Sequence, residues 1–110
     1  MRRLLILAGL IPAAVAFAQG APKAAPLDGH ALFEARCGMC HDAGGMGTGL
    51  LARRVQPAEL ARRTDLQAEF VVQAARVGIG NMPQITRGDV SDAELHAIAN
   101  WLATPPDQRK

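Results

Sequence analysis

A chain of 110 residues is long enough for a single small domain. Its 12 lysine and arginine residues exceed its 10 aspartate and glutamate residues by two, and Arg2 and Arg3 account for that excess, so the rest of the sequence is electrically balanced and lacks the dense basic stripe of a nucleic-acid-binding protein. Beyond residue 20 the aromatic side chains are Phe33, Phe70 and Trp101, and a small domain with so few large apolar side chains is expected to need a disulfide, a metal or a cofactor.

The N-terminal residues have the pattern of a secretory signal peptide. Two arginines precede an apolar run over residues 4–15, and the tripeptide Ala-Phe-Ala that ends at Ala18 has the form of a cleavage site. An uncleaved membrane anchor is the alternative, but the apolar run is short for a membrane span and Pro12 interrupts it. We therefore expect residues 1–18 to be a signal peptide, with export to the periplasm and no stable membrane insertion after cleavage.

The first predicted helix begins after Asp28, which can cap it, and runs to about Gly38. Leu27 and Leu32 have the spacing of a hydrophobic staple across this helix start. Leu32 and Phe33 are expected to form the buried face of the helix.

The middle of the chain predicts a loop followed by two helical segments. Residues 42–49 contain four glycines and predict a loop. A proline at the start of residues 57–63 can open a short helical turn there. Thr64 and Gln67 have the spacing of a capping box for a helix over residues 65–77. The apolar stripe of that helix is expected to be Leu66, Phe70, Ala74 and Val77.

A second loop, rich in glycine and proline, is predicted over residues 78–89, before a last helix. Ser91 and Glu94 have the spacing of a capping box at the start of this helix, and Pro105 follows its end. The buried face of the helix is expected to be Leu95, Ile98, Ala99 and Leu102.

These elements predict an all-α domain with three main helices and a short one. No stretch of the sequence alternates convincingly like a strand. The domain is expected to span residues 27–104, after a flexible leader over residues 19–26 that is rich in proline and alanine. Residues 105–110 are expected to form a tail.

Both cysteines and one of the three histidines lie together as Cys37-Gly-Met-Cys40-His41. Cys-x-x-Cys-His is the attachment motif for c-type haem. Each thiol forms a thioether with one porphyrin vinyl group, the two intervening residues let both sulfurs reach one edge of the ring, and the histidine becomes the proximal iron ligand. We therefore predict one covalent haem c, attached through Cys37 and Cys40, with His41 as an axial ligand and the haem completing the core.

Three other uses of these cysteines explain less of the sequence. A thioredoxin-like redox pair needs a βαβ context, which is not predicted. A structural zinc site needs four ligands, and His30 and His96 lie on separate predicted helices. A disulfide suits an exported protein but leaves His41 and the small core unexplained, although it keeps a small disulfide-bonded binding module as an alternative.

The sixth position of the iron has three candidate methionines after the signal peptide. Met39 lies inside the attachment motif and Met46 shortly after it, so both are expected to stay on the proximal side of the haem. Met82 lies beyond two helical segments, in a loop that Asn81 and Pro83 keep non-helical. Because His/Met ligation is the usual way in which such carriers raise their potential, we predict Met82 as the sixth ligand.

With these motifs the chain resembles the class I c-type cytochromes over residues 27–104. The matching parts are "CGMCH", "NMP" and the C-terminal "AELHAIANWLAT". The resemblance implies a small cytochrome c fold, in which a few helices surround the haem and the first and last helices cross. The crossing is expected near Gly29 and Phe33, with Trp101 packed against it.

The sequence departs from the family pattern after the haem motif. Members often have Gly-x-Gly-Pro there, and the proline carbonyl accepts a hydrogen bond from the proximal histidine. In this chain Thr48 takes the place of the proline. We expect its carbonyl to accept that bond from His41 and so to set the imidazole tautomer.

The predicted function is one-electron transfer rather than enzyme catalysis. A haem protein with an open sixth site, for gas binding or catalysis, is the alternative, and ligation by Met82 would exclude it. The chain is also similar to the small cytochrome subunits of periplasmic dehydrogenases, which implies a dehydrogenase as electron donor and an oxidase or another cytochrome as acceptor. Lys23 and Lys110 are the only lysines of the sequence and both lie in its predicted terminal segments, so lysines are not expected to surround the haem edge. We therefore expect a haem edge framed by an uncharged rim of Gly38, Met39, residues 44–48 and residues 79–83.

Overall fold

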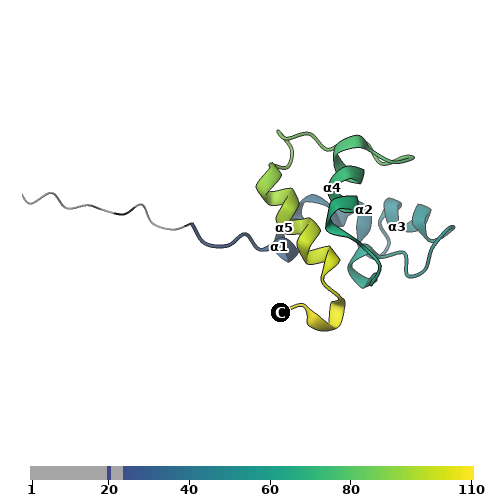
Figure 1. The fold of residues 1–110 in the computed structure, drawn as a ribbon. Coiled ribbons are helices and arrows are strands. Elements are labelled where there is room, and N and C mark those ends of the chain that lie inside the picture. The colour runs from purple at the N-terminus through teal and green to yellow at the C-terminus, as the bar shows by residue number, and fades with distance from the viewer. Residues whose placement is uncertain (1–19, 21–23) are drawn as a thin grey trace, which may run out of the picture.

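The computed structural model describes residue 20 and residues 24–110. The predicted signal peptide and most of the predicted leader lie outside this part. The helices of the described part are α1 (Gly29–Arg36), α2 (Gly38–His41), α3 (Met46–Leu51), the 3-10 helix η1 (Leu60–Arg62), α4 (Ala68–Val77), α5 (Asp92–Ala103) and the 3-10 helix η2 (Pro106–Gln108). The prediction of an all-α domain is confirmed, with α1, α4 and α5 as the three main helices (Figure 1). Within residues 24–110, no helix has both the length and the apolar character needed to cross a membrane.

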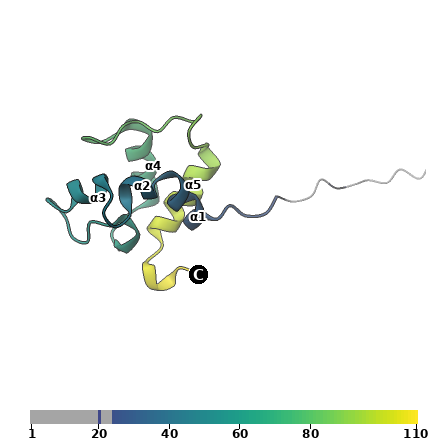
Figure 2. The same ribbon diagram turned by 180° about the vertical axis from the view of Figure 1, so that it is seen from behind.

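The hydrophobic core lies where α5 packs against both α1 and α4 (Figures 1 and 2). Its buried members are Phe33, Ala75, Val90, Leu95, Ile98 and Leu102. The predicted faces of the first and last helices are therefore confirmed, because Phe33 is 1% exposed and α5 buries all four predicted residues. Below, "core cluster" means these six residues.

The crossing of α1 and α5 depends on the absence of a side chain at Gly29. A Cβ atom added there would lie 2.7 Å from the Cβ atom of Trp101 and 2.9 Å from the carbonyl carbon of Ala97. The Trp101 ring contacts the rings of Phe33 and His30, with centroid distances of 5.2 and 4.7 Å. The first and last helices thus cross where the resemblance implied, with an aromatic cluster beside the glycine.

We expect Gly29→Ala to lower the free energy of unfolding by ~1–3 kcal/mol, because backbone must move to admit the methyl group. Denaturant unfolding of the intact protein measures this change. Gly88→Ala is the matched control, since its nearest heavy atom would be the Oγ1 atom of Thr86 at an ordinary 3.5 Å. Equal stabilities of the two variants would show that the crossing tolerates a side chain at Gly29.

The haem motif interrupts the first predicted helix. Asp28 caps α1 as predicted, with its Oδ1 atom accepting from the backbone N–H groups of His30 and Ala31 at 3.0 and 3.1 Å. The helix does not run on to Gly38, because Cys37 leaves helical geometry with φ −122° and ψ −26°. A separate single turn, α2, then begins at Gly38.

The prediction of a loop over residues 42–49 is wrong from Met46 onwards, where α3 begins. Its first turn contains glycines, and each glycine in a helix interior costs about 1 kcal/mol relative to alanine. Tertiary packing offsets this cost, because α3 packs against α2 and Thr48 is 8% exposed.

The helix predicted over residues 65–77 starts later, at Ala68, with Gln67 as its N-cap and no capping side chain. The predicted Thr64–Gln67 capping box is therefore wrong. Asp65 instead pairs with the extended Arg63, whose Nε and Nη2 atoms donate to its carboxylate at 2.9 and 2.6 Å. The turn predicted over residues 57–63 is reduced to η1.

The predicted stripe is wrong at two positions, because Phe70 and Val77 are 53% and 62% exposed. Leu66, which lies just before α4, does pack against the core cluster. The residues that face the core are Val71, Val72 and Ala75. Helical periodicity is the same for both stripes, so the position of α5 decides which one is covered.

The C-terminal end packs onto the domain through Arg109. Its Nε and Nη2 atoms donate to the carbonyls of Thr104 and Leu102 at 2.7 and 3.0 Å, and Nη1 donates to the carbonyl of Ala61. The guanidinium also lies 4.3 Å from the centroid of the Trp101 ring. The segment predicted as a tail therefore connects α5 to η1.

Candidate haem-binding site

The three residues of the motif lie on one helical turn. Cys37 is the N-cap of α2, and its carbonyl accepts from the N–H groups of Cys40 and His41 at 3.1 and 3.0 Å. Residues three and four apart on a helical turn lie on the same face. Both cysteines are free and half-buried, and Cys37 packs against the core cluster.

Two glycines at the start of α3 form the wall behind this turn. A Cβ atom at Gly47 would lie 2.8 Å from the carbonyl oxygen of Cys40 and 3.2 Å from Nδ1 of His41. A Cβ atom at Gly45 would lie 3.0 Å from the carbonyl oxygen of Met39. From the sequence, these glycines were expected to belong to a loop and to an exposed rim. Their position directly after the motif was the available signal that they allow close packing against it.

His41 is half-buried, and its Nδ1 atom is buried without a hydrogen-bond partner. The expected bond to the carbonyl of Thr48 is absent, because Thr48 lies inside α3 and its carbonyl accepts from the N–H of Ala52 at 2.9 Å. Burial lowers the pKa of His41, and the nearby carboxylate of Asp42 opposes this shift. The imidazole is therefore held in the neutral form that coordinates metals.

The pKa of Cys37 is raised to about 11, first by burial, then by the nearby carboxylate of Asp42 and by electrostatic coupling to the thiol of Cys40. The thiol is consequently protonated at neutral pH.

Met82 lies in a tight loop after α4. It forms an isolated antiparallel bridge with Ile79, in which the two backbone hydrogen bonds are 2.9 and 3.1 Å long. Gly78 and Gly80 have φ angles of +79° and +56°, a region that glycine enters without the steric penalty of other residues. Met82 is half-buried and packs against the same core cluster as Cys37.

The other two candidate methionines are largely exposed, Met39 at 91% and Met46 at 69%. The fold thus brings Met82, rather than these two, into contact with the core cluster that Cys37 also contacts.

A family model described as cytochrome C oxidase, cbb3-type, subunit III matches residues 24–102. The chain belongs to this family of c-type cytochromes. No curated protein and no solved structure matches it. As a c-type cytochrome domain, it functions in haem-based electron transfer and has redox proteins as partners.

The residues of this cytochrome fit haem c. Two free thiols lie one turn apart, and the half-buried imidazole beside them is in its coordinating form. The described residues contain no group of three or more His, Cys, Asp or Glu side chains arranged to hold a metal ion. Two thiols and one imidazole in a single turn are the set that attaches and ligates haem c.

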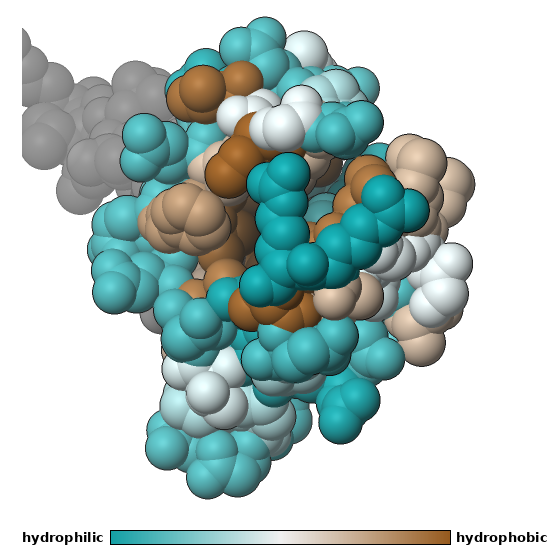
Figure 3. Space-filling view, turned by 90° about the vertical axis from the view of Figure 1, so that its right-hand side faces the viewer, coloured by the Kyte–Doolittle hydropathy of each residue, from teal (hydrophilic) through white to brown (hydrophobic). Residues whose placement is uncertain are grey.

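The cytochrome exposes several large apolar side chains that a haem or a partner could cover. Figure 3 shows hydrophobic surface at the centre of the face that includes α3, with hydrophilic side chains reaching across it. Among the described residues, the large apolar side chains that are exposed are Leu27, Met39, Met46, Phe70, Val77 and Ile79. The expected rim needs correction at two positions, because Gly38 and Thr48 are buried by packing of α2 and α3 and cannot form part of an exposed edge.

Proposed function

We propose that this cytochrome is an exported one-electron carrier with one haem c, attached through Cys37 and Cys40 and ligated by His41 and Met82. The observation that carries the proposal is that Cys37 and Met82, which are far apart in the sequence, pack against the same core cluster. A haem attached at α2 would add apolar surface to this cluster, and His41 and Met82 would be the residues that hold its iron.

The chain's own residues account for the arrangement of such a site. Gly47 lets α3 lie against the imidazole of His41, which limits the orientations of the ring. The bridge to Ile79 restricts the backbone of Met82. When bound, haem c supplies an iron that changes oxidation state by one electron. Restricted positions of His41 and Met82 would reduce the rearrangement that accompanies this change.

Export to the periplasm is supported by the signal-peptide pattern of residues 1–18. As electron donor we propose an exported dehydrogenase, from the similarity in length and pattern to small cytochrome subunits of such enzymes. As acceptor we propose a terminal oxidase, and the description of the matching family, which names an oxidase subunit, supports this choice.

We expect the contact with the donor to depend little on long-range charge. The predicted mature chain has equal numbers of acidic and basic side chains, so strong electrostatic steering is not implied. Met39, Met46 and Ile79 instead provide exposed apolar surface beside the proposed haem. Small contacts of this kind are typical of transient electron-transfer complexes.

The rate at which an exported dehydrogenase reduces the purified protein tests this contact. We expect the second-order rate constant to change by less than about twofold between low and moderate salt, because neutral surfaces are little affected by screening. Ile79→Gln should slow reduction. Arg62→Gln is the control: the Arg62 side chain is 70% exposed and open to a partner, but its replacement should leave the rate unchanged. A steep fall in rate with added salt, together with slow reduction of Arg62→Gln, would place the contact on the arginine-rich residues 53–87 instead.

A further inference from the structure

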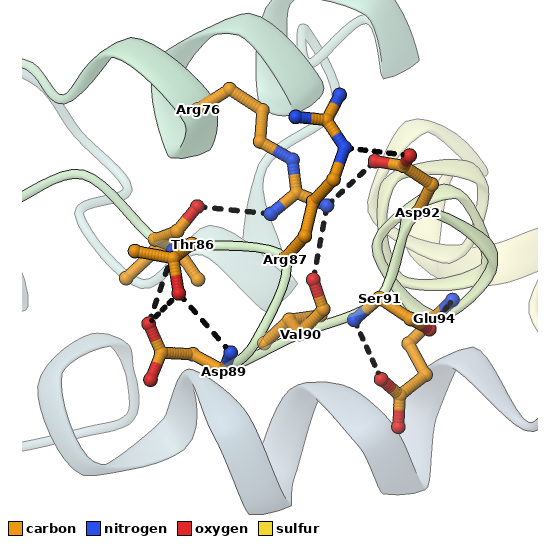
Figure 4. Close-up of polar contacts among 9 residues, drawn as sticks. Arg76, Thr86, Arg87, Asp89, Val90, Ser91, Asp92 and Glu94 are labelled. Atoms are coloured by element: carbon orange, nitrogen blue, oxygen red, sulfur yellow. Dashed lines mark hydrogen bonds and ion pairs between the residues drawn. The ribbon is translucent and has the colours of Figure 1, made fainter.

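Arg76 lies in the last turn of α4, directly before the loop that contains Met82. Its side chain is 14% exposed. Its Nη1 atom donates to the carbonyl of Ile85 at 2.9 Å, and its Nη2 atom donates to the carbonyl of Val90 at 3.0 Å and to Oδ1 of Asp92 at 2.8 Å (Figure 4). One guanidinium therefore joins the end of α4 to two carbonyls of the segment between Met82 and α5, and to the first residue of α5.

Hydrogen bonds hold the chain on both sides of Met82, and on the C-terminal side they reach the end of α4. Before it, the bridge between Ile79 and Met82 closes the loop. After it, the N–H of Ile85 donates to the carbonyl of Ala75 at 2.8 Å while its own carbonyl accepts from Arg76. Both backbone polar groups of Ile85 are thus bound by consecutive residues of α4, and Pro83 restricts the short connection to Met82.

We propose that Arg76 is a positioning residue for Met82, which keeps the methionine loop in one place so that the sulfur stays at the iron. This inference rests on the proposed function, in which Met82 is the sixth ligand. Arginine suits this role better than lysine, because the planar guanidinium donates to three acceptors in fixed directions, whereas a lysine ammonium has no such fixed geometry. The Nε atom is buried without a hydrogen-bond partner. The guanidinium is therefore oriented by its bonds to the two carbonyls and to Asp92, although this orientation leaves one of its N–H donors unpaired.

The start of α5 has contacts of its own that do not involve Arg76. The side chain of Thr86 donates to Asp89 at 2.7 Å, and Ser91 and Glu94 form a capping box (Figure 4). Removal of Arg76 should therefore release the loop of Met82 without unwinding α5.

The test compares Arg76→Leu and Arg76→Lys with Arg87→Leu in the haem-loaded protein. Arg87 is the matched control, because its Nε atom also donates to Asp92, at 2.8 Å, but it does not bind the loop carbonyls, and its side chain is 72% exposed. The readouts are the affinity of the ferric protein for added imidazole, which competes with methionine, and the long-wavelength absorption band of methionine-bound ferric haem. Far-UV circular dichroism confirms that each variant is folded.

We expect Arg76→Leu to raise the affinity for imidazole by on the order of tenfold or more, the effect of losing hydrogen bonds from a charged donor. Arg76→Lys should lie between this variant and the wild type, and Arg87→Leu should match the wild type. If Arg76→Leu does not fold, the lysine variant decides the question. Equal imidazole affinities of the Arg76 variants and Arg87→Leu would overturn the proposal.

Failure of the proposed function would be recognised separately. A wild-type protein without the methionine band would refute ligation by Met82. Hydrogen exchange at the amides of Met82 and Ile85 would then decide whether Arg76 holds the loop: faster exchange in Arg76→Leu than in Arg87→Leu supports that role, and equal exchange overturns it.

Discussion

Replacement of both Cys37 and Cys40 by alanine is expected to leave a largely unfolded chain without covalent haem. The core cluster contains only six buried side chains, and a small domain of this kind has little stability to lose, on the order of 5–15 kcal/mol in total. The haem that we propose would supply much of the missing apolar contact. Loss of its attachment should therefore remove both the visible absorption of the purified protein and the helical signal in far-UV circular dichroism.

Intact mass under denaturing conditions gives the matching result for the wild type. We expect a chain that begins at Gln19 and carries one haem, because thioether bonds survive denaturation. Met39→Ala is the control, since Met39 lies between the two cysteines and is 91% exposed; it should keep its haem. A wild-type chain that releases its haem would refute covalent attachment, and one that retains residues 1–18 would refute cleavage.

Replacement of Met82 by alanine is expected to open the ferrous iron to carbon monoxide. The wild-type protein should show no spectral change at a pressure of carbon monoxide that converts the variant completely, because a bound methionine excludes added ligands. The absorption spectrum of the reduced protein, with and without the gas, measures this difference.

Met46→Ala and Met39→Ala are the controls for Met82, and both should remain closed to carbon monoxide. Their side chains are exposed and do not pack against the core cluster. Fast and tight binding of carbon monoxide by the wild type would contradict the electron-carrier proposal. It would favour a haem protein with an open sixth site, for gas binding or catalysis.

The features of this protein that can be predicted from sequence are those that depend on a few neighbouring residues. Asp28 caps α1, and Ser91 with Glu94 caps α5, because a side chain and the backbone within three residues of it decide a helix start. Gly78 ends α4 with a positive φ for an equally local reason. The candidate haem site belongs to the same class, since Cys37, Cys40 and His41 form one contiguous motif.

Tertiary contacts decided the rest. The glycine-rich run from Met46 folds as α3 because it packs against α2, and glycine's weak conformational preference cannot reveal this in advance. The core-facing side of α4 differs from the predicted stripe because periodicity does not distinguish one apolar face from another. In the sequence, Arg76 cannot be distinguished from an ordinary surface charge, because hydrogen bonds between distant segments leave no local pattern. Only the fold brings the carbonyls of Ile85 and Val90 to its guanidinium.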